Sequence, residues 1–147
     1  IDLGAGTDSL QIANGGGSDI HFDGVETIIA GEGIDGLHID TSGTGGTTIK
    51  YSATNKLGDW INHFTSGTDS LEFSRSAFSG DGNTNGACDA FQSGAGVTDS
   101  SNTDVYFVQD TDTKILYYDA DANGAGVGII AVELDTNIAI GDITFVA

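Results

Sequence analysis

A short phrase recurs three times along the chain, and it constrains the fold more than any other feature. It reads glycine, any residue, glycine, any residue, aspartate, any residue, apolar residue; its aspartates are Asp8, Asp35 and Asp69, and the third copy lacks the first glycine. Glycine permits the positive φ angles of a tight loop. The aspartate carries an oxygen ligand into that loop, and the apolar residue begins a short strand. The phrase therefore predicts alternating glycine turns and short strands.

Composition agrees with an all-β fold. The 147 residues include 23 glycines and no proline, and helical periodicity is scarce. Many tight turns between short strands follow from such a composition. We expect strands at Ser9–Ile12, Ile20–Phe22, Thr27–Ala30, Leu37–Ile39, Thr48–Tyr51, Val105–Gln109, Lys114–Tyr118, Gly128–Leu134 and Asp142–Val146.

The charge of the chain points to cations as partners. The formal net charge is −18, from 22 acidic residues against 4 basic ones, and the acids are mostly aspartate. Aspartate is short and favours turns, so its carboxylate lies close enough to the backbone to complete an oxygen cage. A merely solvated acidic surface remains the alternative. Nucleic acid is not expected as a partner because no basic patch could neutralise phosphates, and an anionic membrane surface is disfavoured for the same reason.

Calcium is the cation that these turns would suit. Ca²⁺ takes six to eight oxygen ligands, and one turn offers a carboxylate with one or two carbonyls, so two adjacent turns would share an ion. The candidate ligands in the repeats are Asp8, Asp19, Asp35 and Asp69. In the alternative interpretation each aspartate only caps its own turn.

A second candidate calcium site follows the strand expected at 114–118. Asp119, Asp121 and Asn123 are spaced as in the opening of an EF-hand loop, but the twelfth position is Ile130 and the flanking segments are strands. A true EF-hand is thereby excluded. A plain hairpin loop and an irregular calcium site both remain open.

Three stretches resemble the C-terminal region of RTX, or haemolysin-type, calcium-binding proteins secreted by type I systems. Residues 64–74 resemble the phrase that follows the repeats, residues 114–124 a tyrosine-aspartate hairpin, and residues 142–147 an aspartate followed by a mostly apolar terminus. The resemblance implies a secreted, extracellular or cell-surface location, calcium-dependent folding, and a C-terminal signal read by the type I secretion machinery. It also implies the calcium-binding β-roll of that family.

The expected organisation has three parts. Residues 1–79 form an irregular, Gly/Asp-rich β-roll (parallel β-helix-like) whose repeats are unevenly spaced. Residues 80–103 form a polar surface loop with a short helical turn around Ala87–Phe91. Residues 104–147 form an antiparallel C-terminal β cap with a secretion-signal-like tail. The chain begins inside a repeat, so we expect a piece of a longer protein, and no segment is long and apolar enough for a membrane span.

Catalytic motifs are missing from the sequence. His21, His38 and His63 belong to no His-Glu-x-x-His pattern and are interpreted as surface or strand-flanking residues. Ser93 lacks the first glycine of a nucleophile elbow, and Cys88 is interpreted as a small buried side chain. The chain is therefore not expected to be an enzyme.

Four aromatic residues, Trp60, Phe64, Phe73 and Phe78, lie close together in the sequence. Core packing is the favoured interpretation, because a thin β-roll needs a bulky hydrophobic cap. A sugar-binding platform is the alternative.

Three functions remain open. The leading hypothesis is a non-catalytic, calcium-dependent folding and export module of a type I-secreted protein. The second is a structural subunit of an extracellular assembly (S-layer, fibre or adhesin) that self-associates through calcium-stabilised β-rolls. The third is the rear domain of a secreted hydrolase.

Overall fold

The computed structural model describes residues 1–42, 45–80, 82 and 85–147, with the side chain of Ser42 left out. Within these residues the fold is all-β, as predicted, and the only helices are two 3-10 turns, Thr54–Lys56 and Ile140–Asp142. No helix in the described part is long and apolar enough to cross a membrane. The strands are β1 (Ser9–Gln11), β2 (Asp19–Val25), β3 (Thr27–Ile29), β4 (Gly36–Ser42), β5 (Thr48–Tyr51), β6 (Asp59–Asn62), β7 (Ser70–Ser74), β8 (Phe91–Gly94), β9 (Phe107–Asp110), β10 (Ile115–Tyr118), β11 (Ile129–Leu134) and β12 (Ile143–Val146).

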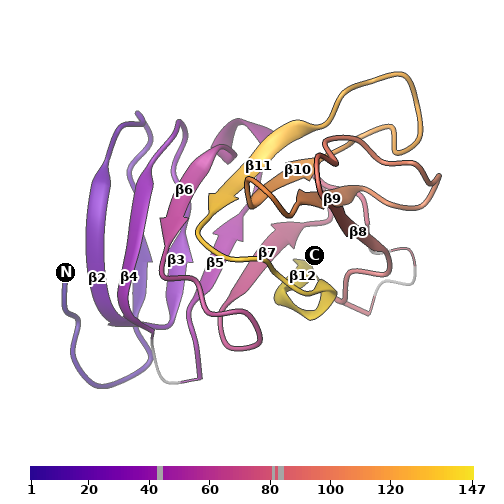
Figure 1. Cartoon of the computed structure of the whole chain (residues 1–147). Coiled ribbons are helices and arrows are strands. Elements are labelled where there is room, and N and C mark those ends of the chain that lie inside the picture. The colour runs from indigo at the N-terminus through magenta and orange to yellow at the C-terminus, as the bar shows by residue number, and fades with distance from the viewer. Residues whose placement is uncertain (43–44, 81, 83–84) are drawn as a thin grey trace.

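The strands form two sheets. One, the parallel sheet, has the order β1-β3-β5-β7-β12, and the other, the mixed sheet, has the order β2-β4-β6-β11-β10-β9-β8. From β1 to β7 successive strands alternate between the two sheets, so each circuit of the chain adds one strand to each sheet (Figure 1). The turns between the sheets carry the glycine and aspartate residues of the repeated phrase.

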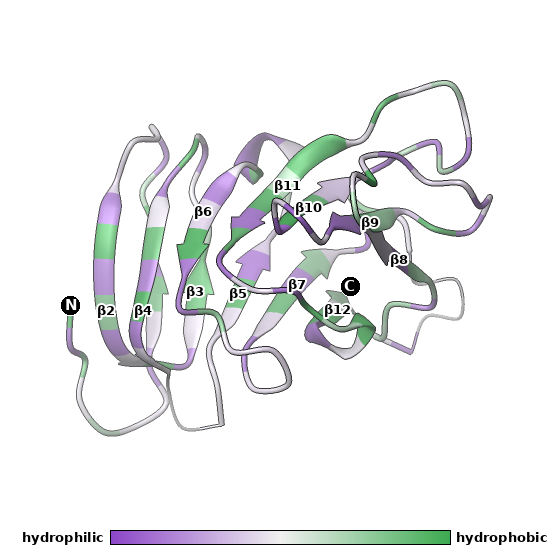
Figure 2. Cartoon of the chain, in the orientation of Figure 1, coloured by the Kyte–Doolittle hydropathy of each residue, from purple (hydrophilic) through white to green (hydrophobic). Residues whose placement is uncertain are grey.

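The core lies between the two sheets because alternate side chains of each strand point inward. Phe22, Leu37 and Ile61 from the mixed sheet are fully buried, as are Ile28 and Ile49 from the parallel sheet. Figure 2 shows the matching bands of apolar and polar residues along these strands. Burial of one such side chain contributes about 1.5–3 kcal/mol, so a few inward residues per circuit stabilise strands this short.

An aromatic cluster joins the early strands to the C-terminal part. The ring of Phe73 lies 5.0 Å from that of Phe78 and 4.6 Å from that of Phe107, measured between centroids. Phe64, Phe73 and Phe78 are buried, which confirms core packing for them. The same prediction is wrong for Trp60, which is 47% exposed because it occupies an outward-facing position of β6.

The C-terminal part is an antiparallel meander only between β9 and β11. The remaining contacts are parallel: β11 pairs with β6, β12 with β7 and β8 with β9. The expected antiparallel cap is therefore correct for three strands and wrong for β12, which leaves the meander and joins the parallel sheet. Its inward residues Ile143 and Phe145 complete the core there.

The segment expected to be a polar loop contains a strand. Phe91–Gly94 forms β8, Phe91 packs against the core, and Ala87 makes an isolated bridge to Thr144. The short helical turn expected around Ala87–Phe91 is therefore wrong, because these residues are held in extended conformations by neighbouring strands. Residues 81, 83 and 84 of this segment lie outside the described part of the chain.

Candidate functional site

Buried carboxylates lie at the end of the mixed sheet where strands β4 and β6 begin. Asp35 accepts a hydrogen bond from the backbone N–H of Ser18 at 2.8 Å, and Asp59 accepts one from the N–H of Asp35 at 2.9 Å. These partners are 17 and 24 residues apart, one circuit of the chain in each case. Each carboxylate thus extends the ladder of backbone hydrogen bonds one step beyond the start of a strand.

The parallel sheet has the same arrangement at the end where its strands begin. The backbone N–H of Asp8 donates to Glu26 at 2.7 Å, and that of Thr47 donates to Asp69 at 2.8 Å. The second oxygen of Asp69 accepts the N–H of Thr65 at 2.8 Å. The carboxylates of Asp35 and Asp69 therefore have a structural role, and each has a partner in a neighbouring circuit, whereas Asp8 takes part through its backbone N–H.

Three carboxylate oxygens in the described residues are buried without a hydrogen-bond partner. They are Oδ2 of Asp8, Oδ2 of Asp35 and Oδ1 of Asp99. A buried ionised oxygen without a partner is costly, and proteins usually compensate it with a hydrogen bond or a metal ion. These three atoms are the places where the acidic turns are least satisfied by the protein itself.

Asp35 and Asp59 form a buried acidic pair with Tyr51. The Tyr51 hydroxyl donates to Oδ2 of Asp59 at 3.1 Å. Burial, assisted by the charge of Asp35, raises the pKa of Asp59 to about 6, although the hydrogen bonds from Asp35 and Tyr51 and the charge of Lys56 oppose the shift. Burial and the Asp59 charge together raise the pKa of Tyr51 well above its usual value. Asp59 was missed by the sequence reasoning because it follows no Gly-x-Gly phrase.

A second buried acidic group lies in the loop between β10 and β11. Asp119 is 1% exposed and accepts hydrogen bonds from the N–H groups of Ser100 at 3.0 Å and Asp121 at 3.3 Å. Burial raises the pKa of Asp119, and the adjacent carboxyl groups of Asp99 and Asp121 raise it further. The hairpin expected here is present, and Asp99 is the residue of the group that the sequence pattern did not indicate.

The six expected calcium ligands do not meet in one place. Asp119 and Asp121 lie together, whereas Asp35 lies beside Asp59 on the mixed sheet. Asp8 and Asp69 lie at the same end of the parallel sheet, before β1 and β7, but strands β3 and β5 separate them. Any calcium bound at Asp8 or Asp35 would therefore need backbone carbonyl oxygens to complete its shell.

Asp19, the remaining expected ligand, belongs to a different group. Among the residues that the structure describes, it forms with His21 and His38 the one set of three potential ligand side chains whose donor atoms lie within 4.8 Å of one another. His21 is exposed and His38 is partly buried, both on strands, as expected. Cys88 is buried, also as expected.

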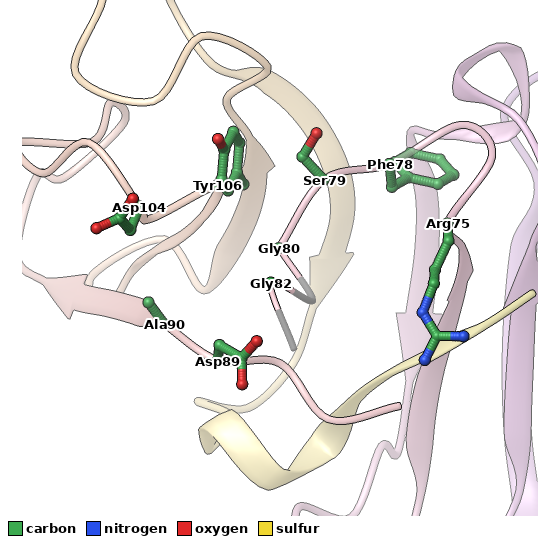
Figure 3. Close-up of a pocket in the computed structure, with 9 residues that line it drawn as sticks. All are labelled: Arg75, Phe78, Ser79, Gly80, Gly82, Asp89, Ala90, Asp104 and Tyr106. Atoms are coloured by element: carbon green, nitrogen blue, oxygen red, sulfur yellow. The ribbon is translucent and has the colours of Figure 1, made fainter. Parts of the chain in front are cut away.

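A pocket of about 680 Å³ lies beside the aromatic cluster (Figure 3). Tyr106, Asp104 and Asp89 point toward it from one side, and Phe78 and Arg75 lie on the other. None of the described residues that line it is a histidine, so Ser79 has no imidazole base there to activate its hydroxyl.

Comparisons of the chain with protein-family models, with curated proteins and with solved structures found no match.

Proposed function

We propose that the chain is a non-catalytic, calcium-dependent folding module of an extracellular protein exported by a type I system. The observation that carries this proposal is the set of buried carboxylate oxygens without partners, on Asp8, Asp35 and Asp99. The chain has 22 acidic and 4 basic residues, so its own cations are too few to neutralise them. Dissolved divalent cations would supply the missing charge.

The arrangement of strands supports a β-roll of irregular form. Successive strands alternate between two sheets, and the circuits that the carboxylate hydrogen bonds connect are 17 to 24 residues long. In this proposal the turns that join the two sheets act as cation sites. Export by a type I system is inferred from the resemblance of residues 64–74, 114–124 and 142–147 to RTX proteins.

The strongest calcium site of the proposal is the group that Asp99, between β8 and β9, forms with Asp119 and Asp121 in the β10–β11 loop. Burial raises the pKa of Asp119, and the neighbouring carboxyl groups of Asp99 and Asp121 raise it further; a bound Ca²⁺ would compensate the negative charge of the ionised group. Asp8 and Asp35 follow, each with one free buried oxygen. Asp69 is less suited because both of its oxygens already accept backbone N–H groups.

Calcium would act by coupling binding to folding. At low calcium the acidic turns repel one another and oppose compaction, which suits passage through a secretion channel. Outside the cell, at calcium concentrations of roughly 10⁻⁴–10⁻³ M, ions would occupy the turns. A ligand that binds only the folded state stabilises that state, so binding free energy becomes folding free energy.

The test is a calcium titration followed by circular dichroism and calorimetry. We expect coil in chelator, β-structure in millimolar calcium, and saturable binding. Asp119→Asn should weaken binding at the loop by about tenfold or more, because a carboxylate ligand becomes a neutral amide. Asp112→Asn is the matched control: Asp112 is exposed in the β9–β10 turn and its backbone N–H bond to Asp110 is unaffected. A spectrum and a melting temperature that chelator leaves unchanged would refute the proposal.

A second function, assembly into an extracellular layer or fibre, is favoured by the sheet edges. β1 and β2 are the edge strands of their sheets and lie at the same end of the molecule (Figure 1). Edge strands carry unpaired backbone groups that can pair with another copy; residues 1 and 2 already bond to His21 and Asp23 of β2, so β1 offers the more open edge. Size-exclusion chromatography with and without calcium separates the two functions: large ordered particles in calcium favour assembly, and a monomer in both conditions excludes it.

A further inference from the structure

The pairing of β2 with β4 brings two histidines side by side on the outer face of the mixed sheet. His21 is aligned with His38, and their rings stack with centroids 4.1 Å apart and planes 4° from parallel. Both face outward because the residues next to them along each strand, Phe22 and Leu37, are buried in the core. Two imidazoles in register on adjacent strands offer two nitrogen ligands from a rigid support.

A carboxylate completes the group because a glycine leaves room for it. Oδ1 of Asp19 lies 2.8 Å from Nε2 of His38, across the start of β4. The residue aligned with Asp19 is Gly36, and a Cβ at that position would lie only 3.0 Å from the same oxygen. The absence of a side chain at Gly36 therefore allows Asp19 to reach the neighbouring strand.

The imidazole of His38 has an unsatisfied nitrogen at this point. Its Nε2 is buried and makes no hydrogen bond, although Oδ1 of Asp19 is near. Nε2 of His38 and Oδ1 of Asp19 are thus in contact without a properly directed hydrogen bond. A third partner placed between them could bind both atoms. A cation is that partner, because a carboxylate oxygen and an imidazole nitrogen both donate lone pairs.

We propose that Asp19, His21 and His38 bind one divalent transition-metal ion of the zinc class. Zinc is held tetrahedrally by imidazole nitrogen and carboxylate oxygen at about 2.0–2.2 Å, which places ligand atoms about 3.3–3.6 Å apart. The three donor atoms already lie within 4.8 Å of one another. Imidazole lone pairs lie in the ring plane, so the exposed His21 ring tilts out of its parallel stack with His38, and the exposed Asp19 side chain rotates, to bring all three donors onto one ion. Water fills the fourth position. Calcium is not the ion expected here, because it prefers oxygen ligands to imidazole nitrogen.

Two further residues orient the ligands. Nδ1 of His21 lies 3.1 Å from Oδ1 of Asp40, the carboxylate–histidine pairing that leaves Nε2 for a metal. The side-chain amide of Asn62 lies 3.0 Å from Nδ1 of His38. With metal on Nε2, Nδ1 carries the proton, so the amide turns its oxygen toward that nitrogen.

The experiment is a zinc titration of the calcium-saturated protein, followed by NMR of its three histidine rings. We expect His21 and His38 to shift together and saturate at one zinc per chain. His63, on the loop after β6 with its N–H bonded to Asp135, serves as the internal control and should not move. The site is independent of the proposed calcium sites, so it survives if calcium proves irrelevant, and the titration is then run without calcium.

Variants measure the contribution of each residue, with circular dichroism as the check that each one folds. His38→Gln should reduce zinc affinity by more than about 100-fold, and Asp40→Asn by about 10-fold. His63→Asn should leave the affinity unchanged. Co²⁺ gives a second readout: it should quench the single tryptophan, Trp60, whose ring lies 5.4 Å from that of His38. Equal shifts at all three histidines, or unchanged affinity in folded His38→Gln, would overturn the proposal.

Discussion

Asp59 is the residue whose ionisation should control stability between acidic and neutral pH. Its pKa is about 6 in the folded chain against a usual value of 3.8, so the folded state holds the proton more tightly than the unfolded state. The resulting stabilisation is complete below about pH 3.8 and is lost as pH rises through about 6. The difference between these two pKa values corresponds to a loss of about 3 kcal/mol in the free energy of unfolding between acidic and neutral pH.

Asp59→Asn should abolish this pH dependence. Asparagine keeps an oxygen to accept the Asp35 N–H and adds an amide that can donate to the Tyr51 hydroxyl. We expect the variant to be more stable than the parent at about pH 8, by up to about 3 kcal/mol, and similar to it near pH 4. Urea unfolding of both proteins at the same calcium concentration measures the difference. A difference that stays constant across this range would show that Asp59 ionises normally in the folded chain.

At this scale the sequence indicated the turns but not the partners of their side chains. The repeated phrase identified Asp8, Asp35 and Asp69, and all three lie where strands begin. The N–H groups that the carboxylates of Asp35 and Asp69 accept from neighbouring circuits belong to Ser18 and Thr47, which are 17 and 22 residues away in the sequence. Asp59 and Asp99 belong to no copy of the repeated phrase. No local pattern signals a contact made across the structure.

Among the turns, the one before β5 is the most sensitive to a side chain. Gly46 has φ of +99°, and a Cβ there would lie 1.9 Å from the carbonyl oxygen of Thr68 in the turn before β7. Gly45 has φ of +86° and nothing within 4 Å of such an atom. The two neighbours thus differ in steric contact while sharing a left-handed backbone.

Gly45→Ala should therefore cost about 1–2 kcal/mol, the penalty for a left-handed non-glycine residue. Gly46→Ala should cost more, about 4 kcal/mol, because two circuits must move apart. Thermal unfolding of the two variants in the same buffer provides the comparison. Equal melting temperatures would mean that the circuits are not in contact at Thr68.

Most strands with alternating apolar residues were predicted from the sequence, but β7 was missed although its Leu71 and Phe73 alternate with polar residues and are buried. Strands without such alternation were not predicted. Thr48–Tyr51 has the predicted bounds, and the C-terminal strands differ from prediction by one or two residues at an end. β6 reads Asp-Trp-Ile-Asn and β8 reads Phe-Gln-Ser-Gly, with one apolar inward residue or fewer to mark them. Their extended conformation comes from pairing with distant neighbours, which is also why the parallel order of β12 was not foreseen.

For the molecule as a whole, net charge opposes the compact folded state. A net charge of −18 on 147 residues repels itself, and added salt of any kind screens that repulsion, with a Debye length that falls from about 30 Å at 0.01 M to about 3 Å at 1 M. Screening alone therefore stabilises the fold without any bound ion. Specific calcium binding must exceed this general effect to matter.

Magnesium separates the two effects. It has the same charge as calcium and screens equally well, but it demands octahedral geometry at about 2.0–2.1 Å and keeps its water. Irregular turns built from one carboxylate and several carbonyls should therefore hold calcium and not magnesium. At equal ionic strength we expect sodium and magnesium salts to raise the melting temperature by small and similar amounts, and calcium to raise it further and saturably. If magnesium equals calcium, the acidic turns respond to diffuse charge alone, and the oxygens of Asp8, Asp35 and Asp99 are not ligands.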